Sequence, residues 1–188
     1  ILLQACDSLA EAHRRGLVHR DIKPGNIFLC QYAFKHDVAK ILDFGLAKPT
    51  RLDAADDIGL SNTEVIRGTP AYMAPELALG EGAVDGRADF YALGCVAYWL
   101  LTGHLVFDAS SPTAMLVAHI RQQPVPPGRR SELPVPPELD ELILACLAKE
   151  PSARVPSAEQ MASALVGIPV ASAWTGEQAA EWWKTHGL

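Results

Sequence analysis

The feature that most constrains this chain is a polar stretch, HRDIKPGN at positions 19–26, which DFG follows at 43–45. The first stretch places a carboxylate at Asp21, an ammonium group at Lys23 and an amide at Asn26, and the second stretch adds another carboxylate. A carboxylate can accept a proton from a hydroxyl group, and carboxylate and amide oxygens are ligands that Mg²⁺ prefers. The plainer alternative is a solvated surface loop in which the aspartate hydrogen-bonds its own backbone.

A third motif, GTPAYMAPE at 68–76, favours the chemical interpretation. Together the three motifs resemble the catalytic loop, the magnesium loop and the end of the activation segment of a eukaryotic-type serine/threonine protein kinase of the bacterial style. Only Ile22, which replaces a leucine, departs from the first motif. The resemblance covers residues 1–168 and implies the C-terminal lobe (C-lobe) of the catalytic domain. The implied fold is α+β and mostly α-helical, with a small β-hairpin that carries the catalytic and magnesium loops.

The resemblance implies a role for each polar group of the first two motifs. Asp21 is the base for the acceptor hydroxyl, and Lys23 offsets charge on the transferred phosphate. Asn26 and Asp43 hold Mg²⁺ against the phosphates of ATP, and Asn26 thereby also counts among the catalytic residues. Lys23 contacts the nucleotide as well. Phe28 stands where the family has the floor beneath the adenine ring.

The segment between the second and third motifs resembles an activation segment. Its middle, Thr50 to Glu64, is polar, acidic and aperiodic, which predicts a mobile loop. The resemblance implies that Arg20 receives a phosphate carried by this segment, and Ser61 and Thr63 are the candidate sites. The alternative is that both are unmodified loop hydroxyls. Thr69 is a poorer candidate, because the family uses that hydroxyl to bond the catalytic aspartate and lysine.

The substrate class follows from the same comparison. A lysine two residues after the catalytic aspartate resembles the serine/threonine branch, so we expect the acceptor to be a serine or threonine hydroxyl in a protein. Gly25 offers no acidic group with which to select basic peptides. The residues implied to seat the acceptor chain are Thr69, Pro70, Ala71 and Tyr72.

Five residues are implied to hold the site together. His19 packs under Phe44, although it can also be interpreted as a general base. Asp89 accepts backbone N–H groups of the catalytic loop, caps the helix near its N-terminus, or does both. Arg154 pairs with Glu76, and the alternative is a surface charge.

The remaining patterns predict a helical body. Phe90 to Leu101 is apolar on all sides, which predicts a helix enclosed by others, and its 12 residues fall short of the ~20 that span a bilayer. A buried strand at 27–29 and a partner at 38–42, joined by a polar turn around 35–37, form the predicted hairpin.

The tail, residues 169–188, differs in character from the rest. Its sequence predicts a short helix that bears Trp182 and Trp183. Packing against the lobe and contact with a partner or a membrane surface are both open for these residues and for Trp174.

The chain as a whole fits one lobe of a larger enzyme. The net charge of −6 argues against binding nucleic acid, and four cysteines that are far apart in the sequence indicate reduced thiols in a cytoplasmic protein. Ile1 already lies within an amphipathic pattern, and the sequence contains no glycine-rich nucleotide loop. We therefore expect the N-terminal lobe (N-lobe) upstream, any membrane anchor outside these residues, and an inactive fragment as the chain stands.

Two other function classes compete with an ATP- and Mg²⁺-dependent protein kinase. A non-catalytic pseudokinase or scaffold usually lacks one of Asp21, Asn26 and Asp43, and all three are present here. A small-molecule kinase shares these three residues but has no segment like 68–76 for seating a polypeptide. Both alternatives are therefore disfavoured.

Overall fold

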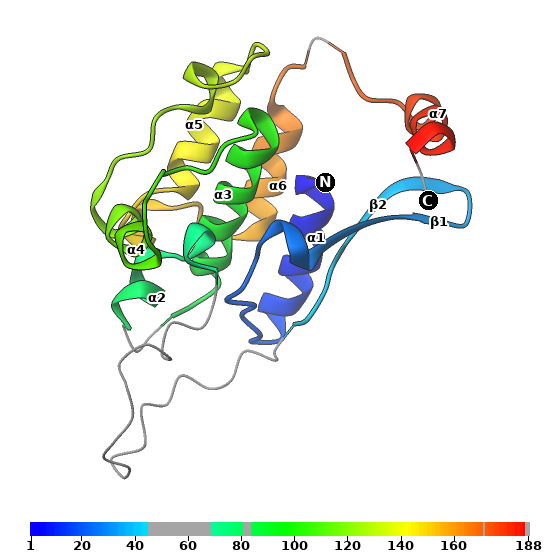
Figure 1. The fold of residues 1–188 in the computed structure, drawn as a ribbon. Helices are drawn as coiled ribbons and strands as arrows, with labels where there is room; N and C mark the ends of the chain where they lie inside the picture. The colour runs from blue at the N-terminus through cyan, green and yellow to red at the C-terminus, as the bar shows by residue number, and fades with distance from the viewer. Residues whose placement is uncertain (45–68, 81–83, 171, 187–188) are drawn as a thin grey trace.

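The structure, a computed structural model, describes residues 1–44, 69–80, 84–170 and 172–186. Within these residues the chain is mostly helical with one two-stranded antiparallel sheet, which confirms the predicted helix-rich α+β character (Figure 1). The elements follow in the order α1 (Leu2–Arg14), η1 (Pro24–Asn26), β1 (Ile27–Tyr32), β2 (Lys35–Ile41), η2 (Pro70–Tyr72), α2 (Pro75–Leu79), α3 (Arg87–Thr102), α4 (Pro112–Arg121), η3 (Pro127–Arg129), α5 (Pro137–Cys146), η4 (Pro151–Ala153), α6 (Ala158–Gly167) and α7 (Gly176–His186), where η denotes a 3₁₀ turn.

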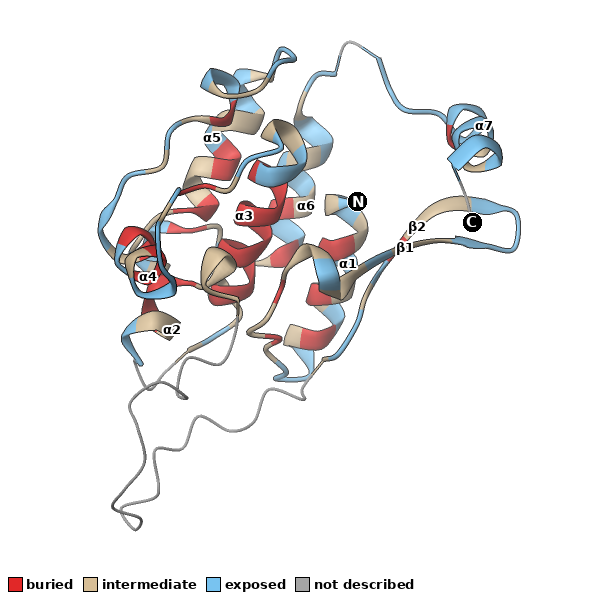
Figure 2. Ribbon diagram, in the orientation of Figure 1, coloured by how far each residue is buried: buried red, intermediate tan, exposed pale blue. Residues whose placement is uncertain are grey.

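Helix α3 forms the centre of the helical body. Every residue from Ala88 to Tyr98 is buried, and α3 contacts α1 and α5 (Figure 2). The predicted enclosure fails at the end of the apolar run, where Trp99 and Leu100 are 38% and 43% exposed. Gly94 permits the close approach of α5, because a Cβ there would lie 2.8 Å from the Cβ of Cys146. The helix ends at Gly103, whose φ of 69° is left-handed. No helix in the described ranges is long and apolar enough to cross a membrane.

The helix boundaries follow local capping chemistry. The Ser111 hydroxyl accepts a hydrogen bond from the backbone N–H of Ala114 at 3.1 Å and starts α4. Ser157 does the same for Gln160 at 3.2 Å and starts α6. Gly16, at φ 74°, follows the end of α1. Each of these boundaries depends on residues close to one another in the sequence.

The hairpin is longer and more exposed than predicted. β1 and β2 pair from Ile27 opposite Ile41 to Tyr32 opposite Lys35, so the predicted turn around 35–37 is wrong and these residues belong to β2. The chain reverses at 33–34 instead. The hairpin projects from the helical body and is exposed over much of its surface (Figure 2), so its strand positions tolerate polar residues. The prediction of a buried strand at 27–29 also fails, since Phe28 is 56% exposed.

The tail packs against this hairpin. Helix α7 lies over its far end and contacts β2 (Figure 1). The indole N–H groups of Trp174 and Trp183 donate to the two carboxylate oxygens of Asp37, at 2.6 and 2.7 Å. Asp37 has a left-handed φ of 55°, which aspartate tolerates better than most residues. The tail thus packs against the hairpin, while Trp174 and Trp182 are 60% and 43% exposed, and their contact with a partner or a membrane surface stays a prediction.

A buried histidine in the core makes the stability of the fold depend on pH. Burial, with the nearby charge of Lys149 as the second cause, lowers the pKa of His119 to about 4. Unfolding returns this pKa to near 6.5, so between these values the unfolded state binds the extra proton. The contribution of neutral, buried His119 to the unfolding free energy is therefore fully present above about pH 6.5. It is lost as the pH falls from 6.5 toward about 4.

We expect the wild-type chain to lose about 2 kcal/mol more unfolding free energy between about pH 7.5 and 5 than His119→Gln does. Urea unfolding of both proteins at the two pH values measures this difference. Equal losses of unfolding free energy in the two proteins would contradict the lowered pKa of His119.

Candidate active site

The predicted catalytic loop lies between α1 and the hairpin and is held by a carboxylate of α3. Asp89 is fully buried, and its two carboxylate oxygens accept the backbone N–H groups of His19 at 2.9 Å and Arg20 at 2.7 Å. Arg20 adopts a left-handed φ of 65°, a strained conformation that these bonds stabilise. The N-cap residue of α3 is Gly86, with no side-chain cap, so Asp89 serves the loop and not the helix end.

His13 completes this support, although it is absent from the predicted site. Its Nε2 lies 2.8 Å from Asp89 Oδ2, and its ring meets Phe90 edge-on at 5.4 Å between centroids. A Cβ on Gly86 would lie 2.6 Å from the imidazole, so the glycine makes room for the ring. The sequence signal is a histidine within the apolar face of α1, because a part-buried imidazole needs a polar partner.

His19 links the catalytic loop to the end of the hairpin. Its Nε2 lies 2.7 Å from the carbonyl oxygen of Leu42, and its Nδ1 lies 3.3 Å from the backbone N–H of Asp21. A carbonyl only accepts and an N–H only donates, so the ring is the neutral Nε2–H tautomer. The imidazole also packs edge-on against Phe44 at 4.9 Å, which is the predicted packing contact. With both nitrogens engaged, His19 has no nitrogen available to act as a base.

The side chains of the loop converge on Asp21. Lys23 Nζ donates to Asp21 Oδ2 at 2.7 Å. The amide nitrogen of Asn26 donates to the same oxygen at 3.1 Å and to the Asp21 carbonyl at 2.7 Å. Both donors engage Oδ2, no residue in the described ranges donates to Oδ1, and the Asp21 side chain is 37% exposed, so the described residues leave Oδ1 open to a reacting group. The geometry suits a carboxylate that accepts a proton at one oxygen while the other is neutralised.

The hairpin brings Asn26 and Asp43 to the same end of the sheet. η1 ends at Asn26 and β1 follows directly, while the backbone N–H of Leu42 donates to the Asn26 carbonyl at 2.9 Å. Asp43 is exposed and has a left-handed φ of 63°. The Asn26 amide donates through its nitrogen, which leaves its Oδ1 as a ligand atom. One amide and one carboxylate oxygen fit Mg²⁺, which takes few protein ligands and completes its shell with water and phosphate.

The other predicted site residues are distributed along the chain. Phe28 lies on β1, and the predicted seating residues are Thr69 and the three residues of η2, which packs against α3 and α4. In the described residues the hydroxyl of Thr69 makes no hydrogen bond to Asp21 or Lys23, and these two bond each other directly. Ser61 and Thr63 lie outside the described residues.

The predicted pair between Glu76 and Arg154 is present and buried. The guanidinium donates to both carboxylate oxygens at 2.6 Å, and the two residues are 5% and 4% exposed. The remaining guanidinium N–H groups donate to the carbonyls of Ala148, Lys149 and Arg87. The pair joins α2, which follows the seating turn, to the segment between α5 and α6. The alternative of a surface charge at Arg154 is therefore excluded.

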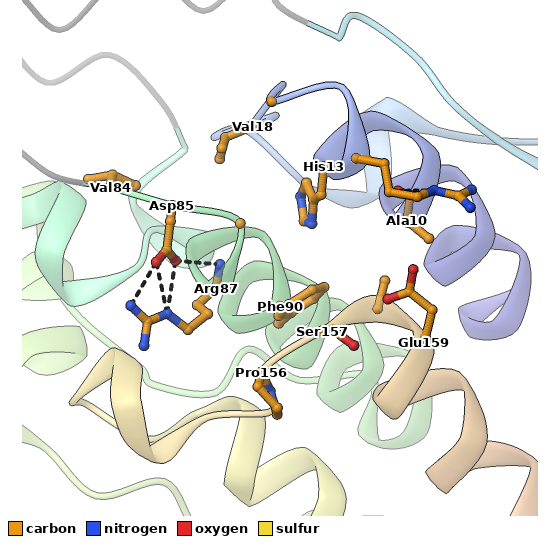
Figure 3. Close-up of a pocket in the computed structure, with 14 residues that line it drawn as sticks. Ala10, His13, Val18, Val84, Asp85, Arg87, Phe90, Pro156, Ser157 and Glu159 are labelled. Carbon is orange, nitrogen blue, oxygen red and sulfur yellow. Dashed lines mark hydrogen bonds and ion pairs between the residues drawn. The ribbon is translucent and has the colours of Figure 1, made fainter.

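A pocket of about 530 Å³ lies beside the end of α1 (Figure 3). It is lined by the end of α1, the residues before α3, the start of α3 and the start of α6, and His13 of α1 and Phe90 of α3 reach it. A solvent-exposed ion pair between Asp85 and Arg87 lies at its edge, with 2.7 Å between Arg87 Nη2 and Asp85 Oδ2. None of the residues that converge on Asp21 lines this pocket.

Comparison with known proteins identifies the family. The family model described as the protein kinase domain matches residues 1–166. The chain belongs to the protein kinase domain family.

Bacterial serine/threonine-protein kinases are among the relatives of this kinase domain chain. It is 41% identical over 170 residues to PknB of Mycolicibacterium smegmatis, with 89% of this chain and 25% of the relative covered. It is 48% identical over 166 residues to Pkn1 of Myxococcus xanthus, with 88% and 23% covered. PknB of Mycobacterium tuberculosis is 37% identical over 168 residues, with 89% and 25% covered. The chain thus spans about a quarter of the length of these relatives.

Proposed function

We propose that this chain is the C-lobe of a serine/threonine protein kinase, which transfers the γ-phosphoryl group of ATP to hydroxyl groups of proteins. The observation that carries the proposal is the set of bonds from Lys23 and Asn26 to Oδ2 of Asp21. That set leaves Oδ1 of Asp21 without a donor among the described residues, on a side chain that is 37% exposed, so an acceptor hydroxyl can approach it. The kinase names of the relatives support the reaction class.

Asp21 accepts the hydroxyl proton on Oδ1 as the acceptor oxygen attacks the γ-phosphorus. The bond from that phosphorus to the bridging oxygen breaks, and ADP leaves with the electron pair. Lys23 holds Asp21 in place and offsets negative charge on the transferred group. Asn26 and Asp43 hold Mg²⁺, which when bound neutralises charge on the phosphates.

Protein acceptors are proposed to lie on η2, through Thr69, Pro70, Ala71 and Tyr72. The turn connects to the buried ion pair through α2, so its position is fixed by the core of the lobe. Arg20 is proposed to bind a phosphate on Ser61 or Thr63 through its guanidinium group. This ion pair would link the activation segment to the catalytic loop. The Asp89 bond to the Arg20 backbone supports this role, because it fixes the start of that side chain.

Residues 1–168 are proposed to form the lobe, and residues 169–188 an extension docked on the hairpin. The N-lobe, with the glycine-rich loop that holds the nucleotide, is proposed to lie outside these residues, since the sequence contains no such loop. The exposed Phe28 on the hairpin supports this, as the floor of a site completed by other residues. Four free cysteines suit the cytoplasm, where ATP is available.

The test is transfer of labelled γ-phosphate from Mg·ATP by the full-length protein, to itself and to dephosphorylated casein. We expect label on serine and threonine, lost when EDTA removes Mg²⁺, and mapping then tests Ser61 and Thr63. Label on added choline or an aminoglycoside, with none on protein, would instead establish a small-molecule kinase. Nucleotide binding without any transfer would establish a scaffold.

A further inference from the structure

The tail of the chain contacts a carboxylate of the hairpin that none of the proposed roles involves. The indole N–H groups of Trp174 and Trp183 donate to separate oxygens of Asp37, at 2.6 and 2.7 Å. An indole nitrogen only donates, and a hydrogen bond to a charged acceptor is stronger than one between neutral groups. The neighbouring Trp182 is 43% exposed, and its ring stacks on His186 at 4.7 Å between centroids. Asp37 is therefore a specific attachment point for the tail.

Helix α1 holds the same residue through its backbone. The Gln4 amide nitrogen donates to the Asp37 carbonyl at 2.8 Å, and the Gln4 amide oxygen accepts the backbone N–H of Ala39 at 2.9 Å. This side chain thus engages two edge groups of β2, as a neighbouring strand would. Asp37 has a left-handed φ of 55°, a conformation that a residue with a side chain keeps only where its surroundings hold it. Its backbone is held by α1 and its side chain by the tail.

Strand β2 connects this attachment point to the proposed nucleotide site. Phe28 of β1 lies opposite Lys40 in the register of the hairpin. The strand between Asp37 and Ile41 spans about 13 Å, and Asp43 follows shortly after it. A two-stranded hairpin is marginally stable by itself, so its orientation depends on the elements that it contacts. Both α1 and α7 contact β2, and α7 lies over the far end of the hairpin (Figure 1).

We propose that Asp37 is a positioning residue for Mg·ATP. By binding the two indoles of the tail, its side chain keeps the backbone in the conformation to which Gln4 bonds. The opposite end of the hairpin then presents Phe28 and Asp43 to the nucleotide and its metal ion in one orientation. The proposal rests on the proposed function, which assigns these two residues to the nucleotide site. It predicts that loss of the tail contact weakens nucleotide binding and leaves acceptor binding unchanged, because η2 packs against α3 and α4.

The experiment compares Trp183→Phe with Trp182→Phe in the full-length protein. The two tryptophans are adjacent in α7 and each variant loses one indole N–H, but that of Trp183 is the one that bonds Asp37. For Trp183→Phe we expect amide exchange at Ala39, whose N–H is bonded to Gln4, to be about five-fold faster. The Kd for Mg·ADP, measured by calorimetry, should rise about five-fold, and the KM for a peptide acceptor should stay within about two-fold. Trp182→Phe should leave all three values unchanged.

Asp37→Asn tests the other partner of the bond. Asparagine also tolerates the left-handed conformation, but it has one acceptor oxygen and no charge, so this variant should reproduce the effects of Trp183→Phe. The double variant should bind Mg·ADP about as tightly as Asp37→Asn alone, because both changes remove the same bond. If thermal unfolding shows that Trp183→Phe is not folded, Trp174→Phe removes the other indole donor and takes its place.

Equal affinities of Trp183→Phe and Trp182→Phe for Mg·ADP would overturn the positioning role, even if Trp183→Phe were the less stable protein. Equal rises in the Kd for Mg·ADP and in the KM for the peptide would overturn it as well. A wild type that binds Mg·ADP but transfers no phosphate would contradict the proposed function, while the affinity comparison still decides the role of Asp37. A wild type that binds no nucleotide would overturn both.

Discussion

Replacing Asp21 with asparagine is expected to lower kcat for phosphoryl transfer by about 10³-fold. The amide has nearly the same shape and still offers an oxygen to Lys23 Nζ, now 2.7 Å from the carboxylate. It cannot take the proton of the acceptor hydroxyl, so the loss falls on the chemical step. Steady-state transfer of labelled phosphate by the full-length protein measures the effect, and the KM for ATP should change by less than about two-fold.

The matched control is Asp7→Asn, which makes the same change at an exposed carboxylate of α1. We expect it to keep the wild-type rate. Thermal unfolding must show that both variants are folded. If Asp21→Asn kept more than a tenth of the wild-type kcat, Asp21 would not be the base.

The second large effect is expected from Glu76→Gln, which should cost about 3–5 kcal/mol of unfolding free energy. The substitution keeps the shape of the side chain but leaves the buried guanidinium of Arg154 without its counter-charge. The three backbone carbonyls that accept from Arg154 cannot neutralise it. Urea unfolding followed by circular dichroism measures the loss.

Asp85→Asn is the control for this prediction, because it breaks an ion pair of similar length whose side chains are 54% and 36% exposed. It should cost less than about 1 kcal/mol. Adding Arg154→Met to Glu76→Gln should recover part of the loss, because the stranded charge is then gone. Equal costs for Glu76→Gln and Asp85→Asn would mean that the pair contributes little to the lobe.

Much of this site could be predicted because its residues lie in short motifs. The hydrogen bonds among Asp21, Lys23 and Asn26 join groups that are close in the sequence, and the helix ends depend on local caps. Glu76 and Arg154 are far apart in the sequence, and only the family resemblance predicted their contact. The structure then supplied what motifs do not specify, namely which oxygen of Asp21 is occupied.

The hairpin and His13 show where sequence patterns were insufficient. Residues 35–37 are polar, and polarity normally marks a turn, but a projecting hairpin is solvated along its strands and tolerates such residues. His13 fits the apolar periodicity of α1 and gives no sign of its distant partner. The contacts of buried His119 could not be predicted either, because the sequence does not specify which buried groups contact one another.

The two indole bonds to Asp37 have a consequence for how this domain is delimited. The family match ends at residue 166, yet Trp174 and Trp183 bond a residue near the start of the chain. A protein shortened to the matched region would lose both donors and the helix that covers the hairpin. A low stability of such a protein could then be blamed on the catalytic residues. Its cause would be the loss of the two indole hydrogen bonds to Asp37, at the opposite end of the same two strands.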